Sequence, residues 1–340
     1  MEKTILITGA TGYLGSHTWC ALLAAGYNII GLDNLSNSVA EVVGCVAEIT
    51  QTKPYFVEGD VRNTNFLSTL FSKYKIDAVI HFAALKSVGE SVENPLAYYD
   101  TNINGLLTLT KVMALHMVKK LVFSSSATVY GDPHRVPIKE HFSLSAANPY
   151  GRTKLMGEQI LRDLEQPDND WRIAYLRYFN PVGAHKSGLI GEDPRGEPNN
   201  LMPLIAQVAI GKLDKLYVYG GDYATADGTG VRDYIHVMDL AHGHLAALSK
   251  LFNCVPSFTV NLGTGEGYSV LDLIHAYEKA SGRPIPYEII ARRPGDVGAC
   301  YADTALAAEI LNWHSIRGLD EMCADSWNWQ QKNPNGFSNA

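Results

Sequence analysis

The 340-residue sequence lacks the features that mark several classes of protein. It contains no stretch of about 18 apolar residues, so a membrane-spanning helix is not expected. It has no basic run longer than a pair and a net charge of -7, which argues against nucleic acids and anionic membranes as partners. The apolar segment near the N-terminus ends at Gly9 and is too short for a signal-peptide core. The expected location is therefore the cytoplasm.

Cysteine is also scarce, with five residues that are widely spaced. None belongs to a C-x-x-C pair, which argues against a disulfide framework and against a zinc site. The sequence has no H-E-x-x-H segment either, so no metal is expected. We interpret most of the cysteines as free thiols in a reducing compartment; they are Cys20, Cys45, Cys254, Cys300 and Cys323.

The chain has the composition of a globular protein, with 46% hydrophobic residues, and its length predicts about two domains. Its first half alternates short apolar runs with longer segments of helical period. This alternation predicts right-handed βαβ units and an α/β, Rossmann-type, doubly wound parallel sheet. Strands are expected at 4–8, 28–33, 54–59, 78–83, 120–124 and 172–178, and helices at 13–25, 39–50, 63–73, 96–117 and 150–165.

The pattern changes after about residue 180, where residues 181–201 are rich in Gly, Pro, Asn and Asp. A long loop is expected there, and such loops tend to be functional. We predict a nucleotide-binding domain over 1–180 and a smaller, mixed α/β C-terminal lobe over 181–340, with a boundary that the chain can cross back over. In this lobe we expect a helix near 202–211, a strand near 216–219, a loop at 220–232, mixed short elements to about 290 and a helix at 319–331.

A glycine-rich segment directly follows the first predicted strand and opens a helix. Gly9, Gly12 and Gly15 permit positive φ, close approach of a pyrophosphate, and tight packing of helix on strand. The free N–H groups of the helix N-terminus face such an anion. Asp33 ends the second strand, 18 residues beyond Gly15, where a carboxylate accepts from ribose hydroxyls and repels a 2′-phosphate. The segment therefore predicts binding of NAD rather than NADP.

Tyr150 and Lys154 are spaced i, i+4 and share one face of a predicted helix. A lysine ammonium beside a phenol, with a positive nicotinamide nearby, lowers the tyrosine pKa from about 10 towards neutrality and makes the phenolate a general base. The motif alone is weak, because one Y-x-x-x-K is expected by chance. A serine run that closes the fifth strand, Ser124–Ser126, adds a hydroxyl that can bridge substrate and tyrosine.

Together these residues resemble the UDP-glucose (UDP-galactose) 4-epimerases of the extended short-chain dehydrogenase/reductase superfamily. The resemblance covers nearly the whole chain, and its passages are strong in their joint order and spacing. Those passages are Gly9–Gly15, 33–37, 81–86, 124–131, 148–154, 177–183, 198–202, 228–239 and 292–296.

The resemblance implies a tightly bound NAD that is regenerated in each turnover, with Ser126, Tyr150 and Lys154 as catalytic residues at its nicotinamide end. It places Tyr13 and Leu14 at the pyrophosphate, beside the glycines. The remaining positions implied for the cofactor are Asp33, Asn34, Leu35, Ser36, Asn37, Ser38, Asp60, Val61, Phe82, Ala83, Ala84, Leu85, Lys86, Asn102 and Phe179.

The resemblance also implies a UDP-hexose substrate that is held mostly by the C-terminal lobe. A diphosphate needs cations, and Arg232 and Arg293 on glycine-bearing loops offer bidentate forks. Besides Ser126 and Tyr150 at the reacting hydroxyl, the implied substrate positions are Asn180, Asn199, Asn200 and Leu201 along the UDP-sugar, Tyr217, Val218 and Tyr219 at the uracil, Asp296 at the ribose, and Cys300 at the sugar.

Cys300 departs from many bacterial members, which carry a bulky tyrosine at that position. A cysteine frees roughly the volume of a phenyl ring, so we predict that N-acetylated UDP-hexoses are also epimerised. The alternative is that neighbouring side chains refill the space. The resemblance also suggests a homodimer through the predicted helices 96–117 and 150–165, whose apolar content exceeds one core-facing stripe.

Three other functions stay open at this point. A nucleotide-sugar 4,6-dehydratase needs an acid–base pair beside the serine, whereas Ser126 is followed by Ala127 and Thr128. A non-catalytic NAD-binding sensor could dispense with the tyrosine and the lysine, both of which this chain keeps. A net reductase or UDP-sugar oxidase would depend on added NAD.

Overall fold

The computed structural model describes residues 3–196, 198, 200–293 and 295–337. The chain divides into two compact units, each assembled from three stretches. Unit 1 comprises Met1–Gly131, Ser143–Tyr178 and Ala241–Val260, and unit 2 comprises Asp132–Phe142, Phe179–Leu240 and Asn261–Ala340. The change of unit after Tyr178 lies beside the boundary predicted at residue 180, and the chain later returns to unit 1 for residues 241–260.

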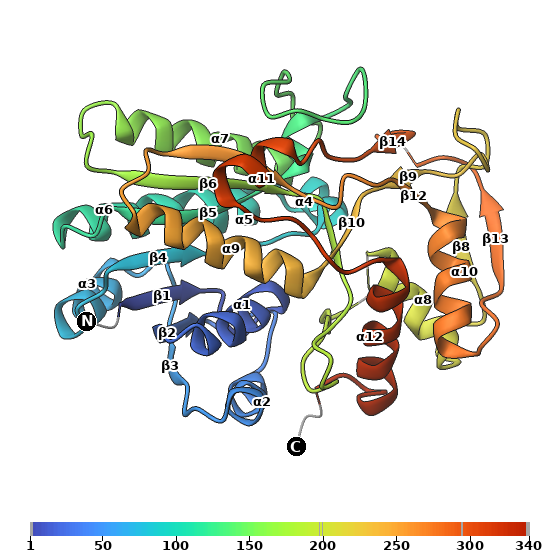
Figure 1. Ribbon diagram of the computed structural model, residues 1–340, viewed down its shortest axis with the longest axis horizontal. Helices are drawn as coiled ribbons and strands as arrows, with labels where there is room; N and C mark the ends of the chain where they lie inside the picture. The colour runs from blue at the N-terminus through green and yellow to red at the C-terminus, as the bar shows by residue number, and fades with distance from the viewer. Residues whose placement is uncertain (1–2, 197, 199, 294, 338–340) are drawn as a thin grey trace. The chain divides into compact units, whose positions relative to one another are not determined.

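Among the described residues, the largest sheet has seven strands in the order β11-β6-β5-β4-β1-β2-β3 (Figure 1). Every pairing from β3 through to β6 is parallel. The strands form because their apolar runs are buried on both faces, as in Ile5–Ile7 of β1. This confirms the predicted α/β, Rossmann-type fold. The strands are β1 (Thr4–Thr8), β2 (Asn28–Asp33), β3 (Tyr55–Glu58), β4 (Ala78–His81), β5 (Lys120–Ser126), β6 (Arg172–Tyr178) and β11 (Phe258–Leu262).

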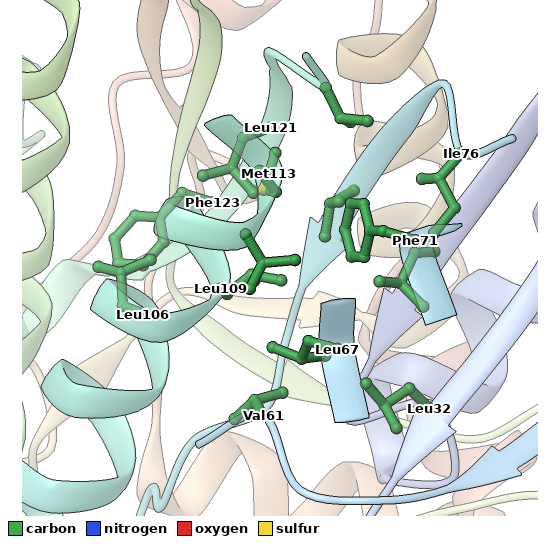
Figure 2. Packing of buried hydrophobic residues seen from close by; sticks show 14 of the residues in the cluster. Leu32, Val61, Leu67, Phe71, Ile76, Leu106, Leu109, Met113, Leu121 and Phe123 are labelled. Atoms are coloured by element: carbon green, nitrogen blue, oxygen red, sulfur yellow. The ribbon is translucent and has the colours of Figure 1, made fainter. Parts of the chain in front are cut away.

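The helices of unit 1 bury apolar side chains against this sheet. Figure 2 shows part of the core, in which residues of α3 and α6 gather over alternate residues of the strands. Leu67 and Phe71 of α3 and Leu109 of α6 belong to this cluster, as do Leu32 of β2 and Leu121 of β5. The helices are α1 (Tyr13–Ala24), α2 (Glu41–Thr50), α3 (Thr64–Lys73), α4 (Val88–Glu93), α5 (Pro95–Tyr98), α6 (Gly105–Leu115), α7 (Pro149–Glu165) and, from Ala241 onward, α9 (Val237–Phe252).

The helix predicted over 96–117 is confirmed over most of that range, but it is not α-helical throughout. A π-helical turn, Tyr99–Asn104, separates α5 from α6. Within that turn, the buried Asn102 side chain hydrogen-bonds both the backbone of Leu85 and the hydroxyl of Thr153. Wider turns of this kind occur at functional sites, where an extra residue lets a side chain reach a partner outside the helix.

The expectation of only short elements up to residue 290 is wrong, because α9 has 16 residues and α10 (Val270–Ser281) has 12. Residues 237–251 of α9 are all buried or half-buried. A short strand, β7 (Asn180–Val182), stands at the start of the predicted loop and pairs with β10.

Unit 2 has its own core, in which α8 and α10 pack with α12. Strand β8 pairs with β13, β7 with β10, and β9 with β12 and β14. Within the described part of the chain, no helix combines the length and the apolarity needed to cross a membrane. The elements not yet given are α8 (Leu201–Ala209), β8 (Leu216–Tyr219), β9 (Val231–Arg232), β10 (Tyr234–His236), β12 (Tyr268–Ser269), β13 (Tyr287–Ile290), β14 (Ala299–Cys300), α11 (Ala305–Leu311) and α12 (Leu319–Lys332).

Candidate functional site

The glycine-rich segment forms a tight connection between β1 and α1. Gly9 has a φ of +69°, and a Cβ there would lie 2.8 Å from the backbone nitrogen of Ala83. A Cβ on Gly15 would collide with the Gly9 carbonyl. Gly12 is the N-cap residue of α1 and has no side chain that could cap the first turn of the helix. This cradle, closed to any side chain, fits the pyrophosphate of a dinucleotide.

Asp33, at the end of β2, joins the glycine segment to the loop that follows it. Its Oδ2 accepts from the Thr11 backbone N–H at 3.1 Å, and its Oδ1 accepts from the Leu35 N–H at 3.0 Å and from the Ser38 hydroxyl at 3.3 Å. Each carboxylate oxygen has further lone pairs, so Asp33 can still accept from ribose hydroxyls. The predicted segment 33–38 thus folds around the carboxylate predicted to read the ribose.

Asp60 follows β3 and belongs to the same edge of the sheet. Its carboxylate accepts from Asn34 Nδ2 at 3.0 Å and from the guanidinium of Arg62 at 2.7 Å. The hydrogen bonds from Arg62 hold the pKa of Asp60 well below its usual range. Asp60, Arg62 and the start of α3 line an open hollow of about 550 Å³. The Val61 side chain lies in the core, so only its backbone is left for a ligand.

The predicted cofactor segment 82–86 follows β4 and is fixed by Asn102. Asn102 accepts from the Leu85 N–H at 2.8 Å and donates to the Leu85 carbonyl at 3.0 Å and to Thr153 Oγ1 at 2.9 Å. Thr153 in turn donates to the Tyr150 carbonyl at 2.7 Å. Asn102, which is implied to bind the cofactor, therefore also couples this segment to the helix that carries Tyr150.

Tyr150, Lys154 and Ser126 come together at the carboxyl end of β5. Tyr150 is hydrogen-bonded to Ser126, and Lys154 Nζ lies 5.9 Å from the centre of the Tyr150 ring. Lys154 donates to the Ser124 carbonyl at 2.7 Å. Ser126 also accepts from Thr128, through the backbone N–H at 3.2 Å and the hydroxyl at 3.0 Å. A phenol, a hydroxyl and an amine in one buried place can exchange a proton with a substrate hydroxyl.

The pKa values of this cluster differ from the simple expectation for an ion pair. Burial raises the pKa of Tyr150 to about 12, against the opposing hydrogen bond from Ser126. Burial also lowers the pKa of Lys154 to about 8. The chain's own residues therefore do not bring the pKa of Tyr150 towards neutrality, although a positive charge held close to the phenol would lower it.

His81, at the end of β4, is a buried group beside this cluster that the sequence analysis did not single out. Its Nδ1 lies 2.8 Å from Thr8 Oγ1, and its ring stacks near Phe123. Burial first, and the charge of Lys154 second, lower the pKa of His81 to about 3. The imidazole is therefore neutral in the folded protein at physiological pH.

We expect His81 to make the protein sensitive to acid. Its folded pKa lies below the unfolded value of 6.5, so its contribution is complete above pH 6.5 and is lost as the pH falls towards 3. At pH 5 the loss is about 2 kcal/mol, from about 1.5 pH units at 1.36 kcal/mol each. His81→Asn should therefore lose about 2 kcal/mol less than the wild type between pH 7 and pH 5 in urea unfolding. The exposed His134→Asn is the control, and equal slopes for all three proteins would contradict the expectation.

In unit 2, the residues predicted to hold the sugar nucleotide lie on several segments. Asn180 is exposed at the start of β7, where its N–H donates to the Asp233 carbonyl at 3.0 Å. Asn200 is the N-cap of α8, which begins at Leu201, and donates to Glu192 Oε1 at 2.8 Å. Asn199, also predicted, lies outside the described residues.

Strand β8 divides the residues predicted to face the uracil. Tyr217 and Tyr219 are exposed on one side of the strand, whereas Val218 is buried in the core of unit 2. Val218 can therefore offer only its backbone to a ligand. The guanidinium of Arg293 lies 4.5 Å from the centre of the Tyr219 ring, and Arg293 pairs with Asp296 at 3.0 Å. The structure thus brings an aromatic face, a cation and a carboxylate together in unit 2.

Arg232 and Cys300 are cross-strand partners on β9 and β14. Arg232 Nη1 donates to the Val297 carbonyl at 2.9 Å, which leaves other donors of its fork for an anion. Burial raises the pKa of the Cys300 thiol to about 11, so the thiol stays protonated and acts through its size. Side chains of paired residues stand on the same face of a sheet, so the side chain at 300 borders Arg232.

Asp233 is a positioning residue that the sequence analysis missed. Its fully buried carboxylate accepts from the N–H and hydroxyl of Thr264, at 2.8 and 2.7 Å, and from the N–H groups of Gly265 and Ala302. It therefore fixes the segments that carry Arg232 and Cys300. In the sequence, the only sign of this role is that Asp233 directly follows Arg232. Its hydrogen-bond partners are distant in the chain, so no local sequence pattern predicts that its carboxylate is buried.

The cofactor candidates lie in unit 1, with the exception of Phe179, and the substrate candidates lie in unit 2, with the exceptions of Ser126 and Tyr150. Phe179 is buried, and its N–H donates to the Leu262 carbonyl at 3.0 Å. Within the described residues, no group of three or more histidine, cysteine or acidic side chains is arranged to hold a metal ion.

Comparison with known proteins finds one family along nearly the whole chain. The model of the NAD dependent epimerase/dehydratase family matches residues 5–263. The UDP-glucose 4-epimerase of Bacillus subtilis (strain 168) is 58% identical over 336 residues, which cover 99% of this chain and 99% of that protein. The crystal structure of UDP-glucose 4-epimerase from Bifidobacterium longum, in complex with NAD+ and UDP, has a TM-score of 0.94 and 53% identity, over 98% of this chain and 100% of that one.

A second solved structure is equally similar. It is that of UDP-glucose-4-epimerase from Stenotrophomonas maltophila with bound NAD and formylated UDP-arabinopyranose. Its TM-score is 0.96 at 50% identity, and the match covers 98% of this chain and 99% of that chain. The chain is therefore similar to these proteins in both lobes as well as in the glycine-rich segment.

Proposed function

The chain belongs to the NAD dependent epimerase/dehydratase family, and from that premise we propose that it is an NAD-dependent isomerase that interconverts UDP-galactose and UDP-glucose by 4-epimerisation. The observation that carries the proposal is the buried cluster of Tyr150, Ser126 and Lys154 beside the glycine cradle. It occurs in a chain that matches 99% of the length of the Bacillus subtilis epimerase. The reaction proceeds through a 4-keto sugar.

Tyr150 is the general base in this proposal. Its phenolate takes the proton of the sugar 4-hydroxyl, while the Ser126 hydroxyl bridges the tyrosine and the reacting oxygen. Lys154 stands on the same helical face and keeps a cation beside the phenol when it is protonated. In the reverse direction Tyr150 returns the proton, so the residue ends each turnover in the state in which it began.

NAD is the resident cofactor in this proposal, and the chemistry that it supplies when bound is reversible acceptance of a hydride. Gly9, Gly12 and Gly15 leave room for its pyrophosphate, Asp33 accepts from its adenine-side ribose, and Asp60 lies at the adenine end. Because the 4-keto sugar is reduced again on its opposite face, the net redox change is zero. The cofactor therefore stays bound between turnovers.

The UDP group anchors the substrate while the sugar turns. Arg232 and Arg293 neutralise the diphosphate, Tyr219 stacks on the uracil, and Asp296 accepts from the uridine ribose. The hexose is held loosely, so that the 4-keto sugar can present either face. Cys300 leaves space at the sugar, and we propose that UDP-N-acetylgalactosamine and UDP-N-acetylglucosamine are interconverted as well.

The test of the proposed function is one incubation of purified protein, without added NAD, with UDP-galactose and with UDP-N-acetylgalactosamine. Chromatography of the products should show conversion of both to their 4-epimers. Conversion of UDP-galactose alone would keep the reaction and exclude the wider substrate range. If neither is converted even after NAD is supplied, the epimerase proposal is wrong.

We also propose that the protein is a homodimer in the cytoplasm. All five cysteines lie among the described residues and are free thiols, as a reducing compartment requires. In unit 1, α4 and α5 contact α7, and these helices leave large apolar side chains exposed. A second copy of the chain would cover such a patch. The exposed side chains are Val88, Val92, Leu96 and Met156.

Leu96→Glu should therefore convert the protein to monomers, because it buries a charge in the proposed interface. Leu96 is 79% exposed in the single chain, and Ile316 of unit 2 is 70% exposed. Ile316→Glu is thus a control that makes the same kind of surface change elsewhere. Light scattering should give the monomer mass for the first variant and the dimer mass for the second. A monomeric wild type, or a dimeric Leu96→Glu protein, would exclude this interface.

A further inference from the structure

One face of α7 carries three polar residues that are four apart, Tyr150, Lys154 and Glu158. Each contacts one residue of the serine run that ends β5. Tyr150 is hydrogen-bonded to Ser126, and Lys154 Nζ donates to the Ser124 carbonyl at 2.7 Å. Ser125 Oγ donates to Glu158 Oε1 at 2.6 Å. The helix is thus fixed to the strand end at three consecutive points, and only the first two involve proposed catalytic residues.

Glu158 is also half of a buried ion pair with β6. Arg177 Nε donates to Glu158 Oε1 at 2.8 Å, and Arg177 Nη2 donates to Oε2 at 2.6 Å. The Glu158 side chain is 1% exposed and the Arg177 side chain is 3% exposed. Arg177 Nη1 donates to the Tyr130 hydroxyl at 3.1 Å. The pair therefore joins α7 to β5, to β6 and to the turn that follows Ser126.

A buried ion pair such as Glu158–Arg177 adds little net stability to a protein. Desolvation of two buried charges offsets most of their attraction, and apolar residues of similar volume often stabilise a protein as well or better. An ion pair differs from apolar packing in direction, because a bidentate guanidinium and carboxylate fix distance and angle together. We therefore interpret the main effect of the Glu158–Arg177 pair as fixing the position of α7 along β5. Its contribution to the stability of the protein is secondary.

We propose that Glu158, held by Arg177 and Ser125, is a positioning residue that sets Tyr150 and Lys154 in register with Ser126 and Ser124. The inference rests on the proposed function, since it assigns the purpose of the register to proton transfer by Tyr150. Glu158 lies two helical turns from Tyr150 and touches none of the proposed catalytic side chains directly. Small displacements of a catalytic group cost large factors in rate, so the register is under strong functional constraint.

The mildest test is Ser125→Ala. It removes the hydroxyl that connects Glu158 to β5, and it leaves both Glu158 oxygens paired with Arg177. We expect kcat for UDP-galactose to fall about tenfold with KM within about twofold of wild type. Ser125→Thr keeps the hydroxyl and should recover most of the lost kcat. Wild-type kcat for Ser125→Ala would overturn the proposal.

A double variant, Glu158→Leu with Arg177→Met, separates position from stability. It replaces the ion pair by apolar side chains of similar volume and leaves neither charge buried alone. We expect a folded protein whose kcat falls about a hundredfold at nearly constant KM. A double variant as stable as the wild type and equally active would show that the pair is merely structural.

The control is Lys119→Gln, which breaks the ion pairs of Lys119 with Asp168 and Asp170 before the first residues of β5 and β6, far along both strands from the serine run. It should keep wild-type kcat whatever its melting temperature. Amide hydrogen exchange gives a readout that needs no activity. Exchange in the first two turns of α7 should accelerate in Ser125→Ala and in the double variant, and not in Lys119→Gln. If the wild type has no 4-epimerase activity, the proposed function fails, and this exchange pattern alone decides whether Glu158 positions the helix.

Discussion

Replacing Tyr150 by phenylalanine should lower kcat by a factor on the order of 10³–10⁴ while the KM for UDP-galactose changes little. Tyr150 is 7% exposed, and its hydroxyl is hydrogen-bonded to Ser126. Phenylalanine keeps the ring and removes only the atom proposed to take the substrate proton. The measurement is steady-state epimerisation of UDP-galactose, with the bound NAD content of each protein determined in parallel.

Tyr178→Phe is the matched control for this prediction. Tyr178 is a second buried tyrosine, at the end of β6, and its pKa is raised well above 10 by burial and by the neighbouring Tyr150. The Tyr178→Phe variant also loses one buried tyrosine hydroxyl, but Tyr178 is not proposed to touch the reacting oxygen. The kcat of this variant should therefore stay within about fivefold of wild type. Near-normal turnover in Tyr150→Phe, or an equal loss in both variants, would remove Tyr150 from the role of base.

The nucleotide-binding half of the fold was predictable because its signals are local. Strands β1, β4 and β5 each contain a short run of three apolar residues, and Gly9 and Asp33 lie directly after β1 and at the end of β2. A residue and its nearest neighbours decide such features. The same logic found Tyr150 and Lys154, since a spacing of four residues places two side chains on one helical face.

The rest depends on contacts that no short segment contains. Asp239 of α9, for example, is hydrogen-bonded to residues 316 and 317, which are 77 and 78 residues away in the chain. Within the π-helical turn, Asn102 is hydrogen-bonded to partners 17 and 51 residues away in the chain. The carboxylate of Asp233 accepts hydrogen bonds from residues 264, 265 and 302, and the sequence next to Asp233 does not predict these partners. The role of Glu158 on α7 is equally hard to predict, because its partners Ser125 and Arg177 lie on the strands β5 and β6.

The pKa of Tyr150 could not be predicted from the Tyr150–Lys154 motif alone. The lysine beside a phenol predicts a lowered pKa, yet burial raises the pKa of Tyr150 and lowers that of Lys154. A site that excludes water disfavours both charges until an external charge arrives. The base is therefore expected to become active together with the bound cofactor.

Cys300→Tyr should abolish turnover of N-acetylated UDP-hexoses and leave UDP-galactose turnover within about threefold of wild type. Cys300 is half-buried on β14 and is the cross-strand partner of Arg232 on β9, the residue proposed to bind the diphosphate. A tyrosine at that position extends a ring from the same face of the sheet, beside the anchored end of the sugar nucleotide. A 2-acetamido group then meets the ring, whereas a 2-hydroxyl is small enough to pass it.

Two further substitutions separate size from chemistry at Cys300. Cys300→Ser and Cys300→Ala keep the position small, and both should turn over UDP-galactose and UDP-N-acetylgalactosamine at rates near wild type. This follows because burial keeps the Cys300 thiol protonated, with a pKa of about 11, so the thiol contributes no charge that serine or alanine would lose. The ratio of kcat/KM for the two substrates is the quantity to compare across the series.

An equal loss of both activities in Cys300→Tyr would mean that the ring disturbs Arg232 and the diphosphate instead. A selective loss in Cys300→Ala would mean that the thiol itself contacts the N-acetyl group, and that size is not the determinant.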